Sequence, residues 1–173
     1  IPKGTKTKDL KGKTIYPSFI DIYSDFGISK PKKQSGSSRG TQYNSSREGY
    51  YWNDHIRPET DASNNFKYNN SKAQAMLKAG FGVINTRTPD GIARGNGVLV
   101  TLNSSSTDAY RILDSKSANY FSLRKSRMSR QAYPGSFMGK TALIRQVFMD
   151  ADWYATGNTI NKDKSLEALI ANK

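Results

Sequence analysis

The chain has 173 residues, of which 27 are Lys or Arg and 14 are Asp or Glu, so its formal net charge is +13. It contains no Cys and a single His, which excludes disulfides, thiol catalysis and zinc ribbons. No stretch approaches the ~18 consecutive apolar residues of a membrane span. The length fits one domain but falls short of the about 250 residues of a closed eight-stranded α/β barrel.

The first 13 residues are polar and rich in Lys, and they begin with Ile1-Pro2. Neither an initiator Met nor an apolar signal stretch stands at this end. We therefore expect the sequence to be a piece of a longer polypeptide.

The best-marked strand lies between Gly12 and Gly27, in the segment KGKTIYPSFIDIYSDFG. β-branched and aromatic residues dominate its apolar positions, and Pro17 is compatible only with a strand start, an edge or a bulge. A nearly continuous apolar run is typical of a strand buried on both faces, as in α/β folds. We predict a doubly buried strand over residues 14–23.

The segment KGKTIYPSFID resembles the opening of the barrel in the amidohydrolase superfamily. There a short β element leads through G-K-x-(I/V)-(Y/L/M)-P-G-(F/L)-(I/V)-D-x-H-x-H into the first barrel strand. Residues 50–62, 80–102 and 133–154 likewise resemble successive segments of one branch of exported bacterial amidohydrolase-like proteins. The resemblance implies an incomplete (β/α) TIM-barrel-like α/β fold, in which residues 1–13 end a β-sandwich-like arm and residues 14–173 are the N-terminal portion of the barrel. It also implies hydrolysis of non-peptide C–N bonds, zinc or another divalent metal as family cofactor, and a periplasmic or exported location.

Tyr23 and Asp25 stand where the family has its two metal-binding His residues. A phenol is a poor zinc ligand at neutral pH because its pKa is about 10. Since His55 is the one remaining His, we expect no metal centre and no cofactor from this chain alone, and hence a structural or pseudo-enzymatic role. At the end of a first barrel strand, Tyr23 and Asp25 are expected to line a pocket mouth, with the phenol donating to the carboxylate.

Residues 29–47 contain six Ser, two Gly and one Pro without apolar periodicity, and so predict a long flexible loop. The aromatic run at residues 50–52 either stacks on nucleic-acid bases or anchors a loop on the core. His55 follows this run, and a lone His is either a surface or hydrogen-bonded residue or a metal ligand.

Capping residues at 69–71 predict a helix over residues 72–79, and Gly80 and an apolar strand at 81–84 follow. Helix, Gly and strand in succession are typical of a parallel α/β unit. A turn at residues 88–91 and a further strand at 98–102 come next. In the family-like arrangement this Gly-rich turn lies at the active face, where Arg87 and Arg94 meet an anionic group or form ordinary salt bridges. The candidate pocket residues are Tyr23, Asp25, Arg87, Asp90 and Arg94.

The C-terminal third predicts a short strand at residues 118–123, a basic run to residue 130 and a helix over 137–154 capped by Ser136. Apolar residues cover most of this helix's circumference, so it requires cover on several sides. Asp163 or Ser165 caps a final helix. With the predicted buried strand, these features imply a partner surface: the rest of a longer polypeptide or another protein chain.

The positive charge supports a second class of function, a basic binding module for nucleic acid or another polyanion. Against it, the Lys residues are spread along the chain, and the densest basic run, at residues 124–130, is typical of a solvated face. Salt dependence separates the two classes, because a polyanion binder loses affinity steeply as salt is added.

Overall fold

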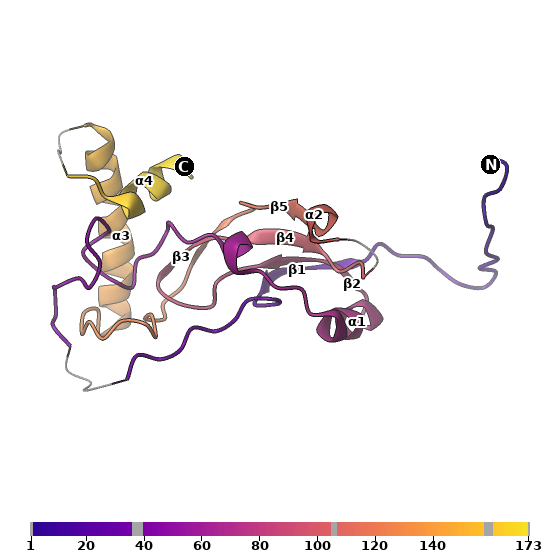
Figure 1. Ribbon diagram of the computed structural model, residues 1–173, viewed down its shortest axis with the longest axis horizontal. Coiled ribbons are helices and arrows are strands. Elements are labelled where there is room, and N and C mark those ends of the chain that lie inside the picture. The colour runs from indigo at the N-terminus through magenta and orange to yellow at the C-terminus, as the bar shows by residue number, and fades with distance from the viewer. Residues whose placement is uncertain (1, 36–39, 105–106, 158–160, 173) are drawn as a thin grey trace.

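A computed structural model describes residues 2–35, 40–104, 107–157 and 161–172 of the chain. The molecule combines sheets and helices, which confirms the α/β class (Figure 1). The helices are η1 (Ala62–Asn65, 3-10), α1 (Asn70–Lys78), α2 (Asp108–Arg111), α3 (Phe137–Ala155) and α4 (Lys164–Ala171). No helix in the described ranges is both long and apolar enough to cross a membrane.

Two sheets are formed. The larger has the order β1-β2-β4-β5 and the smaller pairs β3 with β6. Their strands are β1 (Phe19–Ser24), β2 (Phe81–Thr86), β3 (Ala93–Asn96), β4 (Val98–Thr101), β5 (Ile112–Asp114) and β6 (Asn119–Phe121).

Only one strand pair in these sheets is parallel. β1 and β2 run in the same direction and are connected through α1, which makes a βαβ unit. β2–β4, β4–β5 and β3–β6 are antiparallel. The described residues therefore form no closed barrel. The alternation of parallel strand and helix that the sequence predicts occurs once, in this βαβ unit. Because parallel strands end at the same edge of a sheet, the residues after β1 and β2 lie close together.

β1 differs from the predicted strand in length and in burial. It begins at Phe19, and residues 14–18 form no strand, since Pro17 lacks an N–H and these residues pair with no other strand. β1 is an edge strand whose residues are exposed or half-exposed, so the prediction of burial on both faces is wrong. The apolar run that indicated burial is instead an uncovered apolar edge. Residues 2–13, where the resemblance implies the end of a β-sandwich-like arm, form turns and irregular chain and are almost all exposed.

The helix boundaries follow the predicted capping residues. The side chains of Asn69, Ser136 and Asp163 each accept a backbone N–H in the first turn of α1, α3 and α4. α3 buries one face, through Leu143, Val147 and Ala151, and leaves much of the rest exposed. The cover that its sequence requires on several sides is therefore not supplied by the described residues.

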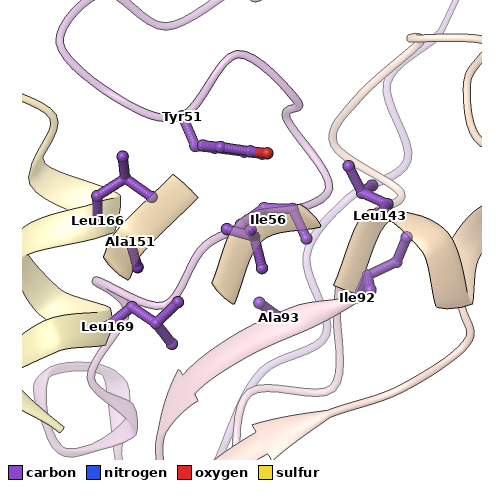
Figure 2. Packing of buried hydrophobic residues seen from close by; sticks show 9 residues of the cluster. Tyr51, Ile56, Ile92, Ala93, Leu143, Ala151, Leu166 and Leu169 are labelled. Carbon is purple, nitrogen blue, oxygen red and sulfur yellow. The ribbon is translucent and has the colours of Figure 1, made fainter. Parts of the chain in front are cut away.

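Two apolar cores hold these elements together. The first core lies between α3, α4, β3 and the segment after residue 50. Its side chains point toward one another in Figure 2. It contains Tyr51, Ile56, Ile92, Ala93, Leu143, Val147, Ala151, Leu166 and Leu169. The second packs β2, β4 and α1 against the chain after β1, and it contains Phe26, Ile28, Ala62, Ala73, Ile84, Val98, Val100 and Leu102.

The predicted loop at residues 29–47 forms no helix or strand in its described parts, and its residues 36–39 lie outside the described ranges. Its second part is tied down by Asp54, whose carboxylate accepts from the hydroxyls of Ser45 and Ser46 at 2.8 and 2.9 Å. Tyr51, from the aromatic run after the loop, is buried in the first core. The anchoring interpretation of that run therefore holds for Tyr51.

Candidate functional site

An open cleft of about 940 Å³ lies where β1 and β2 end, and the start of α3 lines its far side. Seven cationic residues line it, against two carboxylates. The cations are Lys30, Arg87, Arg94, Arg124, Lys125, Arg127 and Lys140, and the acids are Asp25 and Asp90. All five residues singled out in the sequence, Tyr23, Asp25, Arg87, Asp90 and Arg94, lie on this one cleft.

Tyr23 is the last but one residue of β1, and its half-exposed ring lies at the centre of the site. Its hydroxyl oxygen accepts a hydrogen bond from Arg94 Nη1 at 2.9 Å, and the ring of Tyr120 packs beside it. The guanidinium of Arg87 lies over the ring, 3.8 Å from its centroid. The phenol therefore accepts from Arg94, whose guanidinium can only donate, and the expected donation from Tyr23 to Asp25 is not formed among the described residues.

Arg94 comes from β3 and is 4% exposed. Besides Tyr23, it donates from Nε to the Gly91 carbonyl at 3.1 Å and from Nη2 to the Ser122 hydroxyl at 2.7 Å. All three of its nitrogens are thus bound to neutral oxygens. Burial lowers the pKa of the Arg94 guanidinium below its ordinary value. Arg94 therefore links Tyr23, Gly91 and Ser122 in the wall of the cleft.

Arg87 follows β2 directly, and its backbone N–H donates to the Ser24 carbonyl of β1 at 3.1 Å. The residue is 9% exposed, and the buried Nε and Nη1 of its side chain have no hydrogen-bond partner among the described residues. Nη2 is not among these buried atoms. The guanidinium therefore stacks on the Tyr23 ring while its Nε and Nη1 have no acceptor among the described residues.

Asp90 is buried and holds the basic segment of the cleft in place. Its two carboxylate oxygens accept from the Ser126 hydroxyl and from the Arg127 N–H, the latter at 2.7 Å. The same Ser126 donates its N–H to Nδ1 of His55 at 3.1 Å. Asp90 is thus committed to positioning Arg127 and its neighbours.

His55 is fully buried behind this segment. Its Nε2 lies 3.2 Å from the Gln131 carbonyl, while Nδ1 faces the Ser126 N–H. Since a carbonyl only accepts and an N–H only donates, the ring is neutral with its proton on Nε2. Burial lowers the pKa of His55 to about 4, consistent with this state. The residue is hydrogen-bonded and structural, and it does not line the cleft.

The residues that the resemblance aligns with metal ligands do not fit a metal. Tyr23 Oη is engaged by Arg94, and Asp25 Oδ2 lies 3.4 Å from Lys30 Nζ, so each oxygen faces a cation. A divalent ion would enter a cleft that already carries a large excess of positive charge. Within the described part of the chain, no three His, Cys, Asp or Glu side chains gather closely enough to hold a metal ion.

The sequence did not identify the contribution of the segment at residues 122–127 or of Lys140. Ser122 accepts from Arg94, and Arg124, Lys125 and Arg127 line the cleft. Lys125 is fixed by donating to the carbonyls of residues 131 and 132, each at 2.7 Å. The basic run itself was visible, but its position beside the strand ends depends on contacts distant in sequence.

Comparison with known proteins gives one solved structure of similar fold. No protein-family model and no curated protein matches the chain in sequence. The crystal structure of an amidohydrolase from Thermotoga maritima MSB8 is similar with a TM-score of 0.55 and 16% identity. The similarity covers 95% of this chain and 46% of that one, so the chain spans less than half the length of that amidohydrolase. At this identity the likeness is one of fold, and it extends to part of that amidohydrolase.

Proposed function

We propose that the chain is the N-terminal portion of an amidohydrolase-like protein, has no metal centre of its own and plays a structural or pseudo-enzymatic role. The observation that carries the proposal is the hydrogen bond from Arg94 Nη1 to Tyr23 Oη. It directs a cation to the oxygen that would have to bind the metal, at a position where the resembling family has His. The pairing of Asp25 with Lys30 supports the same conclusion.

Elemental analysis tests the metal part of this proposal. The protein is purified without chelator, incubated with zinc and freed of unbound metal by gel filtration. We expect far less than one zinc per chain and no hydrolysis of small amide substrates, because the site lacks ligands and carries excess positive charge. About one tightly held metal per chain would contradict the proposal. Loss of that metal in Asp25→Asn would place it in this cleft.

The apolar edge formed by β1 supports the partner part of the proposal. Phe19, Ile20 and Ile22 are 65%, 58% and 71% exposed on a strand whose outer edge is unpaired in the described structure. Each large apolar side chain left uncovered forgoes roughly 1.5–3 kcal/mol of burial, and an open strand edge promotes pairing with another chain. The partner is further protein surface, from a longer polypeptide or another chain.

Sedimentation velocity tests whether this edge associates. We expect the protein alone to form oligomers or aggregates, and Ile22→Lys to reduce them by placing a charge on the edge. Tyr110→Lys, at an exposed position on α2 away from β1 and α3, is the matched control. A monomer with a sharp two-state thermal transition would contradict the need for a partner surface.

A basic binding module for nucleic acid or another polyanion is the second candidate. The observation in its favour is the concentration of cations on one cleft, of which only Lys30 forms an ion pair with a described residue. Binding to a single-stranded oligonucleotide, measured over a range of salt concentrations, tests this candidate. A steep fall of affinity with salt supports it, and no saturable binding at low salt excludes it.

A further inference from the structure

We propose that the cleft binds the oxyanion group of a small molecule, a carboxylate or a phosphate, with Arg87 as its principal contact. The two buried arginines of the cleft have different roles. Nε and Nη1 of Arg87 have no acceptor among the described residues, whereas each of the three nitrogens of Arg94 donates a hydrogen bond within the protein. Arg94 is accordingly a positioning residue, which holds the ring of Tyr23 on which Arg87 stacks.

The environment of Arg87 is incomplete without an anion. A buried cation normally has an acceptor or a carboxylate, because an unpaired buried charge is costly. Arg87 is nine-tenths buried, yet its Nε and Nη1 have no acceptor and no carboxylate pairs with it in the described structure. An oxyanion in the cleft would supply the missing negative charge, and a guanidinium binds carboxylate and phosphate oxygens in the same planar geometry.

The arrangement around Arg87 is preorganised for such a ligand. Its guanidinium lies over the ring of Tyr23, 3.8 Å from the ring centroid. Arg127 is positioned by the Asp90 carboxylate, and Lys125 by two carbonyls. Arg127 and Lys125 both come from the segment after β6, and these contacts hold that segment in place before an anion enters.

The shape of the site favours a small molecule over a polymer. The cations line a concavity of about 940 Å³, which is within the range of small-molecule sites. One face of the Tyr23 ring is already covered by Arg87, so that face is closed to a stacked base. A nucleic acid is therefore an outcome that the test must separate from the proposal.

The inference rests on the proposed function in one respect, since a divalent metal in the cleft would itself attract an oxyanion. Isothermal titration calorimetry on chelator-treated protein, with metal content measured in the same sample, separates the two. Inorganic phosphate and succinate are the probes, and the stronger one identifies the preferred oxyanion. Anion binding that persists without metal supports the inference. Binding that disappears on chelation contradicts both it and the proposed absence of metal, whereas no binding in metal-free protein contradicts the anion site alone.

Matched variants locate the binding. We expect Arg87→Gln to lower the affinity for the preferred anion about tenfold or more, because the variant loses a charged hydrogen bond to it. Arg145→Gln removes the same charge from an exposed position of α3 outside the cleft, and should change affinity less than about twofold. Equal weakening by both variants would show nonspecific attraction and overturn the assignment.

A second variant tests anion binding without changing the buried Arg87, whose replacement could impair folding. Arg124→Gln combined with Arg127→Gln alters exposed side chains on the cleft, and thermal unfolding should be unchanged. We expect it to weaken anion binding by about threefold through the reduced field. Unchanged affinity in this variant, or tight oligonucleotide binding without phosphate or succinate binding, would refute the proposal.

Discussion

Buried neutral His55 should make the protein less stable in mild acid. Its pKa in the folded state is about 4, against an ordinary value of 6.5. Between these values the unfolded chain binds a proton that the folded protein excludes, so the free energy of unfolding falls as the pH falls. Each pKa unit is worth about 1.4 kcal/mol, which gives a loss of about 3 kcal/mol from pH 7 to 4, with about 2 kcal/mol of it lost by pH 5.

Denaturant unfolding at pH 7 and pH 5, under conditions where the transition is cooperative, measures this loss. His55→Gln should be less stable at pH 7 because two buried hydrogen bonds change, yet it should lose about 2 kcal/mol less on acidification than the original protein. Equal losses in the two proteins would refute the reasoning. So would an NMR titration in which His55 protonates near its ordinary pKa.

The two carboxylates whose pKa values are shifted do not produce the same signal. Burial acts to raise the pKa of Asp54, but hydrogen bonds from Ser45 and Ser46 outweigh it, so that pKa lies below 3.8 and its effect falls at lower pH. Burial raises the pKa of Asp163, which changes stability in the opposite direction as the pH falls. Both carboxylates are present in His55→Gln, so the comparison removes them.

Three further substitutions test the scaffold of the cleft. Gly95→Ala should destabilise the protein by more than about 2 kcal/mol in denaturant unfolding, because φ is +75° and the new Cβ would overlap the Thr60 carbonyl; Gly135→Ala, with open space around it, should be nearly neutral. Asp90→Asn should cost about 2 kcal/mol and speed hydrogen exchange in the segment that its carboxylate holds, and unchanged exchange there would contradict its positioning role. Tyr51→Phe removes a 2.6 Å hydrogen bond to a carboxylate on α3 and should lower stability by about 1–2 kcal/mol, measured in the same way.

The elements that the sequence predicted well are those set by local chemistry. α1, α3 and α4 begin directly after Asn69, Ser136 and Asp163, because a side-chain oxygen of each satisfies N–H groups of the first turn. β2 and β4 are marked by their own apolar residues. These signals lie within a few residues of the element they define.

The failures concern relations between distant segments. An apolar run does not reveal whether anything covers it, so β1 was predicted as doubly buried although it is an exposed edge. The turn after β2 returns the chain to pair β4 with β2 in the antiparallel direction, where the resemblance implied further parallel units. β3 and β5 are four and three residues long, too short to show a period.

The grouping of the candidate site residues followed from topology. Tyr23 and Asp25 stand at the end of one strand, and Arg87 and Asp90 follow the next; β1 and β2 are parallel, so their ends meet. Their roles did not follow, because those depend on partners such as Ser122 and Ser126 that are distant in sequence.

The buried cations of the cleft keep their positive charge uncompensated because their contacts within the protein are with neutral groups. Arg94 is bound by a carbonyl, a hydroxyl and a phenol, all neutral, where a carboxylate would have cancelled its charge. Arg87 rests on an aromatic ring, which stabilises a cation without neutralising it. Of the two carboxylates, Asp90 accepts from a hydroxyl and a backbone N–H, and Asp25 lies at the exposed side with Lys30. Neutral partners thus hold the arginines in place while their field stays available to a ligand, which is the arrangement that anion recognition requires.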